Sequence, residues 1–97
     1  MNDIDVKELK SASNVLRAIT HPLRMRILDF ISKNEPVNVS VIYKKLNLEQ
    51  SVTSSHLAIL RKDGFLLTSR DGKKIYYKVN NERIEQVLSS IKSYFLS

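Results

Sequence analysis

The sequence predicts a mainly α-helical domain that carries one β-hairpin, and three observations lead to this prediction. Apolar residues recur every three to four positions over most of the 97-residue chain. Only two glycines and two prolines are present, so few positions interrupt a helix. After Asp63-Gly64 the pattern changes to alternation on either side of a second Asp-Gly pair, Asp71-Gly72, which is typical of a hairpin.

Two consecutive helices are expected at the start of the chain. Apolar residues at helical spacing predict the first over Asp3–Thr20. The second is predicted over Pro22–Ser32, because proline suits the first turn of a helix. On this second helix, Arg24 and Arg26 are expected on the exposed sides.

A pair of short helices joined by a tight turn is expected next. The first spans Val39–Leu46, the turn is Asn47-Leu48-Glu49, and the second spans Gln50–Lys62. A very short strand at Val37–Val39 would precede them. Two short helices joined in this way, the second polar on its outer face, form a helix-turn-helix.

The last third of the chain predicts a hairpin and a final helix. Strands at Phe65–Ser69 and Lys74–Val79 flank the turn Arg70-Asp71-Gly72-Lys73, and a helix runs from Asn80 to about Leu96. A hairpin that follows a helix-turn-helix is a wing. The predicted fold class is therefore a winged helix-turn-helix, mainly α with a two-stranded β-wing, in a single domain over residues 1–97.

The helix predicted at 50–62 has two distinct faces. At 100° per residue, Thr53, Leu57 and Leu60 fall on one face. The opposite face gathers small residues and ends in a cation: Ser51, Ser54, Ser55, Ala58 and Lys62. An ordinary solvated helix would carry Glu and Lys there, since both are better helix formers than Ser. Small hydroxyl side chains suit contact with the major groove of DNA, and the alternative is a serine-rich surface helix.

Positive charge is concentrated in the middle of the chain. The formal net charge is +6, and the segment from Lys44 to Lys78 holds eight Lys and Arg against three acids, a net charge of +5. This distribution favours a polyanionic partner. Arg70, Lys73 and Lys74 flank the hairpin turn, where they are expected either to reach DNA phosphates and the adjacent minor groove or to be solvated turn cations.

The helices at the two ends, within 1–20 and 80–97, carry more apolar surface than a small core covers. Pairing of these stripes across a two-fold axis would bury them, and each buried aliphatic side chain contributes roughly 1.5–3 kcal/mol. This favours a homodimer over the alternative, in which the stripes complete the core of a monomer. The candidate interface residues are Leu9, Leu16, Leu88, Ile91 and Phe95.

The composition argues against several classes of protein. Without cysteine, disulfides and thiolate metal sites are impossible. No apolar run approaches the ~18 residues of a membrane span, and the acidic N-terminus is unlike a signal peptide, so we expect a cytoplasmic protein. No Gly-x-Ser-x-Gly turn, phosphate loop or metal quartet supports an enzyme, and no cofactor is expected.

From about residue 15 to residue 87, the chain resembles the ArsR/SmtB family of small bacterial winged-helix repressors. The matching segments are LRAITHPLRMRIL, QSVTSSHLAILRKDGFL and SRDGKKIYYKV, in this order. The resemblance implies a homodimer paired through its first and last helices, which binds operator DNA and blocks transcription. It places four residues at the DNA-facing start of the recognition helix: Gln50, Ser51, Ser54 and Ser55.

The chain departs from the family pattern at three positions. His56 comes one residue later than the histidine of many members, and is expected either to contact DNA or to pack at the helix edge. Asn38-Val39-Ser40 replaces a Cys-Val-Cys segment, and Asn81-Glu82-Arg83 replaces a carboxylate-x-His pair, so we expect no Cys- or His-based metal site. The resemblance assigns no effector ligand.

The expected partners are double-stranded DNA and a second copy of the chain, with no membrane. The alternative is a winged helix that serves as a protein–protein interaction module without an operator of its own.

Overall fold

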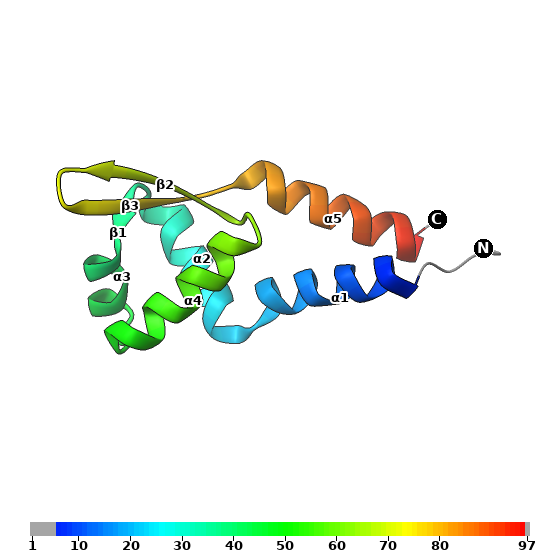
Figure 1. Cartoon of the computed structure of the whole chain (residues 1–97), viewed down its shortest axis with the longest axis horizontal. Helices are drawn as coiled ribbons and strands as arrows, with labels where there is room; N and C mark the ends of the chain where they lie inside the picture. Colours follow the sequence, from blue (N-terminus) through cyan, green and yellow to red (C-terminus); the bar gives the residue numbers. More distant parts are fainter. Residues whose placement is uncertain (1–5, 97) are drawn as a thin grey trace.

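The computed structural model describes the backbone of residues 6–96 and, within this range, the side chains of all residues except 8, 9 and 94–96. The elements of this part are, in order, α1 Val6–Thr20, α2 Pro22–Asn34, β1 Val37–Asn38, α3 Val39–Lys45, α4 Gln50–Lys62, β2 Leu66–Asp71, β3 Lys74–Val79 and α5 Asn81–Leu96. The elements from α2 to β3 form one body, and α1 and α5 leave it in the same direction (Figure 1). The predicted winged helix-turn-helix with an additional helix at each end is confirmed.

Side-chain caps and one left-handed residue set the boundaries of the central helices. His21 Nδ1 accepts a hydrogen bond from the Leu23 amide at the start of α2, at 3.2 Å. Asn38 Oδ1 accepts one from the Val41 amide at the start of α3, at 3.1 Å. Asn47, in the turn before α4, has φ 55°, a conformation that its short polar side chain tolerates better than most residues. The caps thus mark where α2 and α3 begin, and Asn47 supplies the left-handed residue of the tight turn between α3 and α4.

Three predicted helix boundaries differ from the observed ones by one or two residues, whereas both predicted ends of α4 match. α2 continues two residues beyond Ser32, and α3 ends one residue before Leu46. α5 begins one residue after Asn80, because Asn80 caps it: its Oδ1 accepts a hydrogen bond from the Arg83 amide at 3.3 Å. The predicted start of the first helix, Asp3, lies outside the described residues.

The turn of the wing is displaced by one residue from its predicted position. β2 continues to Asp71, which pairs with Lys74, so only Gly72 and Lys73 remain between the strands. Gly72 has φ +63° and occupies the first central position, where a type II′ turn requires glycine. The predicted turn beginning at Arg70 was wrong because this residue still pairs within the hairpin.

The sheet has three strands, in the order β1-β3-β2, and not only the two of the wing. β1 pairs antiparallel with β3, with Val37 opposite Tyr77 and Asn38 opposite Tyr76. The very short strand expected before α3 is therefore present, and it joins the wing to the helical body.

The core lies where α2, α3 and α4 meet the inner face of the sheet. Its fully buried members come from these helices and from the start of the hairpin: Ile27, Ile31, Ile42, Thr53, Leu57, Leu60 and Phe65. Thr53 is the polar member, and its hydroxyl donates to the Glu49 carbonyl at 3.0 Å, so the buried oxygen has a partner. This core fixes α4 in place by one face only.

Candidate nucleic-acid interface

α4 has the two faces that its periodicity predicts. Thr53, Leu57 and Leu60 are buried, which confirms that face as the one against the core. The residues predicted on the outer face are all exposed: Ser51, Ser54, Ser55, Ala58 and Lys62. Gln50, the first residue of the helix, is exposed as well. The outer face thus carries mostly small, hydroxyl-rich side chains, which allow another surface to approach the helix closely.

His56 makes packing contacts within the protein, as one of its two expected roles requires, and a contact with DNA stays a prediction. The side chain is half-buried, and its Nδ1 accepts a hydrogen bond from Arg24 Nε at 3.2 Å. The His21 ring lies 4.9 Å from the His56 ring, centroid to centroid. Burial, and then the charges of His21 and Arg24, lower the pKa of His56 below its ordinary value of 6.5. His56 therefore belongs to a contact between α2 and α4.

Arg24 is not on an exposed side of α2, contrary to its prediction. It is half-buried, and besides its bond to His56 its Nη1 donates to the Ala18 carbonyl at 3.2 Å. The long side chain extends across the junction of α1 and α2 to reach α4. The position of Arg24 around the axis of α2 does not by itself predict this contact with another helix. Arg26 is exposed, as expected.

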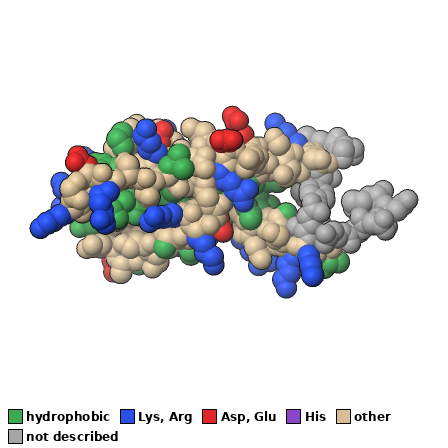
Figure 2. All heavy atoms as spheres, turned by 45° about the horizontal axis from the view of Figure 1, so that its top comes forward, with side chains coloured by type: hydrophobic (Ala, Val, Ile, Leu, Met, Phe, Trp, Pro, Cys, Tyr) green, Lys and Arg blue, Asp and Glu red, His purple; other side chains and the backbone are tan. Residues whose placement is uncertain are grey.

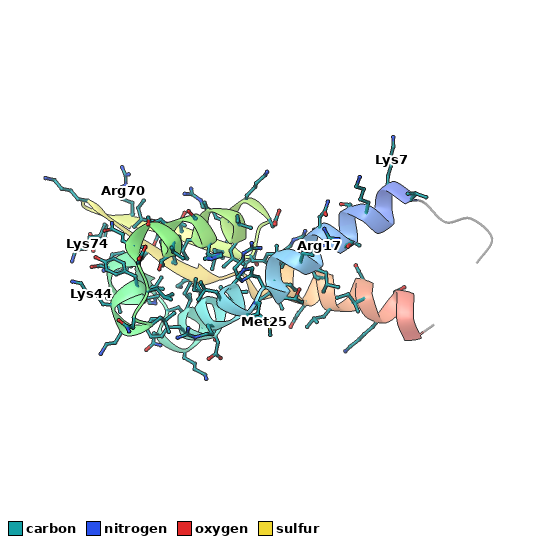
Figure 3. All side chains as sticks on the ribbon, turned by 90° about the horizontal axis from the view of Figure 1, so that it is seen from below. Lys7, Arg17, Met25, Lys44, Arg70 and Lys74 are labelled. Atoms are coloured by element: carbon teal, nitrogen blue, oxygen red, sulfur yellow. The ribbon has the colours of Figure 1, made fainter. Side chains whose placement is uncertain are left out.

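The wing places its cations at its tip. Arg70, Lys73 and Lys74 are all exposed, and Arg70 and Lys74 lie at the same end of the molecule as Lys44 (Figure 3). Figure 2 shows several Lys and Arg side chains gathered at this end. Such a group of exposed cations is suited to neutralising phosphates in a nucleic-acid backbone.

Two residues outside the predicted contact set lie between the recognition helix and the wing. Arg61 of α4 and Tyr77 of β3 line a hollow of about 430 Å³, bounded by α4, β3 and the start of α3 at Val39. We call it the α4–wing hollow. From the sequence, Arg61 is only one of the central cations, and nothing assigns Tyr77 to a site. That both residues line one hollow depends on how β3 packs against α4.

The C-terminal end of α4 is tied to the start of α5. Arg83 Nε donates to the Asp63 carbonyl at 3.1 Å, and the guanidinium carbon lies 5.6 Å from the centre of the Phe65 ring. The side-chain Nδ2 of Asn80 donates to the Gly64 carbonyl at 2.9 Å, and the backbone amide of Asn80 donates to the Phe65 carbonyl at 2.8 Å. Asn80 and Arg83, at the start of α5, therefore satisfy the backbone carbonyls that follow α4.

Arg83, the last residue of the segment that the resemblance aligns with a carboxylate-x-His pair, is used here for this structural contact. Within the described residues, no three His, Asp or Glu side chains come together as a metal site.

The candidate dimer stripe is only partly described. Leu16 and Ile91 are half-buried, and Ile91 packs against the core. Leu88 is 47% exposed. The side chains of Leu9 and Phe95 lie outside the described residues. Among the helices of residues 6–96, none is both long and apolar enough to cross a membrane.

Comparison with known proteins places this geometry in context. The sequence pattern of the family described as "Bacterial regulatory protein, arsR family" matches residues 21–67. The chain is 33% identical over 85 residues to the transcriptional repressor PagR of Bacillus anthracis, an alignment that spans 88% of this chain and 85% of PagR. It is 29% identical over 82 residues to the transcriptional activator HlyU of Vibrio cholerae, spanning 84% and 75% of the two chains.

The fold is similar to that of solved regulators. The crystal structure of NolR from Sinorhizobium fredii superposes with a TM-score of 0.75 and 28% identity, over 98% of this chain and 97% of that chain.

Proposed function

We propose that the chain, which belongs to the arsR family of bacterial regulatory proteins and is a DNA-binding regulator of transcription, acts as a homodimeric repressor. Each subunit places the outer face of α4 in a major groove, and its wing contacts the backbone beside that groove. A protein that binds DNA in this way works in the cytoplasm, where bacterial DNA lies. We propose no Cys- or His-based metal sensing.

One observation carries the assignment of the groove helix: α4 is held to the core by Thr53, Leu57 and Leu60, while its serine face is exposed. A rigidly held helix with small donors and acceptors on its free face is what reading base edges requires. The proposed contacts are Gln50, Ser51 and Ser54 at its start, with Ser55 beside them and Lys62 near its end. His56 supports the helix from α2 through Arg24.

Repression is favoured over activation by the relative PagR, whose name describes a repressor, although HlyU is named an activator. A small DNA-binding domain that occupies a promoter blocks polymerase by steric exclusion alone. In a reporter strain that carries the chain's binding site over a promoter, we expect expression of the chain to lower reporter output. A rise in output would show activation.

A charge substitution tests the groove assignment. In Ser54→Glu, a carboxylate faces the phosphates and base acceptors of the groove, so affinity for duplex DNA should fall roughly 100-fold or more, because opposed like charges cost several kcal/mol. Ser89→Glu, at an exposed serine of α5, is the matched control and should bind as the unchanged protein does. The two are compared by fluorescence anisotropy with labelled duplex.

Unchanged affinity in Ser54→Glu, with both variants folded by circular dichroism, would refute the groove assignment. Absence of salt-dependent DNA binding in the unchanged protein would favour the alternative, an interaction module for another protein.

A further inference from the structure

We propose that the α4–wing hollow receives a backbone phosphate of the bound DNA, held by the guanidinium of Arg61 and the hydroxyl of Tyr77. The inference rests on the proposed function and adds a phosphate site between the recognition helix and the wing tip, which borders the serine face at Ser54 and does not include the cations of the hairpin. Arg61 and Tyr77 come from different elements and line one cavity of about 430 Å³.

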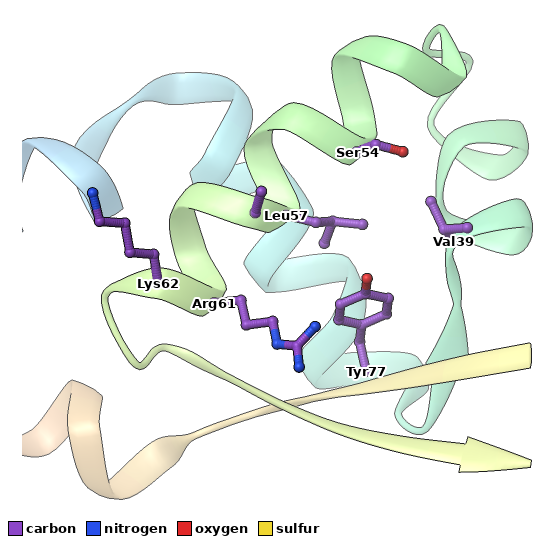
Figure 4. A pocket seen from close by; sticks show the side chains of 7 residues that line it. Val39, Ser54, Leu57, Arg61, Lys62 and Tyr77 are labelled. Carbon is purple, nitrogen blue, oxygen red and sulfur yellow. The ribbon is translucent and has the colours of Figure 1, made fainter.

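The side chains converge because of the geometry of their elements. Ser54 and Arg61 are seven residues apart, so they lie on one side of α4, at the border between its outer face and the buried Leu57. Tyr77 projects from the inner face of β3 and packs against the core, half-buried, so its ring has a fixed place. In Figure 4, Arg61 points toward Tyr77 and the tyrosine hydroxyl is directed into the hollow, whereas Lys62 extends away from both.

The chemistry of the lining selects an anion. Two of the lining residues, Arg61 and Lys62, are cationic, and none is acidic. Among the described residues, no carboxylate pairs with Arg61, so its guanidinium is available for a ligand. A guanidinium binds the oxygens of a phosphate through two parallel hydrogen bonds, and a tyrosine hydroxyl donates a third.

The apolar part of the lining strengthens this interaction. Val39, Leu57 and Ala58 form the remaining wall, and Leu57 is only 2% exposed. Arg61 itself is exposed, so this apolar wall excludes water from one side of its hydrogen bonds only.

The position of the hollow makes a DNA strand the occupant. Ser54 both lines the hollow and belongs to the outer face of α4, while Tyr77 is three residues from Lys74 on the same strand. A strand that borders the groove containing α4 must pass between this helix and the wing if the wing is to touch it. The hollow lies on that path.

Substitution of the two donors separates their contributions. Arg61→Ala should weaken binding to specific and random duplexes about equally, by roughly tenfold, and should reduce the slope of log affinity against log salt by about 0.9, because one phosphate is no longer neutralised. Tyr77→Phe removes only the hydroxyl and keeps the ring. It should weaken binding by roughly threefold with the slope unchanged, since a neutral donor releases no counterion.

Matched controls use the same residue types elsewhere. Arg17→Ala removes an exposed cation of α1, and Tyr76→Phe removes a hydroxyl from the opposite face of β3. Both should keep the affinity and the salt slope of the unchanged protein. All four variants are compared by anisotropy at several salt concentrations, after thermal unfolding has shown that each is folded.

The phosphate site is overturned if Arg61→Ala keeps the full salt slope, or if Tyr76→Phe loses as much affinity as Tyr77→Phe. A failure of the proposed function gives a different result: the unchanged protein itself then shows no salt-dependent DNA binding. That result would refute the phosphate site as well.

Discussion

At the scale of single residues, His56 shows how a residue of the recognition helix is used for support. Its Nδ1 accepts a hydrogen bond from Arg24 Nε, and the His21 ring lies beside it at 4.9 Å. Only an unprotonated Nδ1 accepts this bond, so the folded protein favours neutral His56. The lowered pKa expresses the same preference, because burial and then the charges of His21 and Arg24 oppose protonation.

Stability should therefore depend on pH through His56. Just below pH 6.5, the ordinary pKa of histidine, His56 is protonated in the unfolded state, whereas the folded state still disfavours its protonation. The unfolded state therefore binds more protons than the folded state. The stabilising contribution is complete above pH 6.5 and is lost as the pH falls from there through the lower folded pKa. We expect the urea midpoint to decrease between about pH 7.5 and about pH 5.5, and to decrease less in His56→Gln. Equal pH dependence in the two proteins would contradict this account.

At the scale of elements, the periodicity of one helix predicted its own faces well. The buried positions Thr53, Leu57 and Leu60 follow from spacing alone, because a helix converts sequence separation into angle. Contacts between elements did not follow, since they depend on the packed arrangement. Arg24 meets His56 across 32 residues. The pairing of β1 with β3 and the α4–wing hollow depend on the same packing.

A carboxylate that joins α2 to the sheet shows the same limit. Glu35, directly after α2, accepts a hydrogen bond from the Val79 amide at 2.8 Å, across 44 residues. Nothing in the sequence near either residue indicates this pairing, because it forms only once the hairpin has packed on the helices.

The wing is expected to contact the backbone rather than to read bases. Lys73→Ala combined with Lys74→Ala removes two exposed cations at the tip, so binding to specific and random duplexes should weaken about equally. The salt slope should fall by about 1.8, because each phosphate that is no longer neutralised lowers it by about 0.9. Lys92→Ala, at an exposed position of α5, is the control and should leave the slope unchanged. If affinity falls for one sequence only, the wing reads bases.

At the scale of the whole molecule, the hydrogen bonds from Asn80 and Arg83 connect the end of α4 to the start of α5. α1 and α5 leave the body together, away from the tip of the wing (Figure 1). Pairing of two copies through these helices would therefore fix the separation and direction of the two recognition helices. Such a dimer would set the spacing between the two DNA half-sites.

The dimer is tested best at Leu88. This side chain is 47% exposed, whereas Ile91 is half-buried against the core, so a charge at position 88 disturbs a monomer less. Leu88→Asp should yield monomers by light scattering, because burying an unpaired carboxylate at an interface is strongly unfavourable. Ser89→Asp, one residue away and exposed, should remain dimeric. A dimer that persists in Leu88→Asp would place the interface elsewhere.

The most direct test of the central claim is selection of bound duplexes from a random DNA pool by the unchanged protein. Two subunits that each place α4 in a major groove, joined by a two-fold axis, predict an inverted repeat whose half-sites are centred about 10 base pairs apart, or a multiple of that spacing. Recovery of such a palindrome would support base recognition by the serine face of α4 and its presentation by a two-fold symmetric dimer. Recovery of a single unrepeated motif, or of no enriched sequence, would contradict the account.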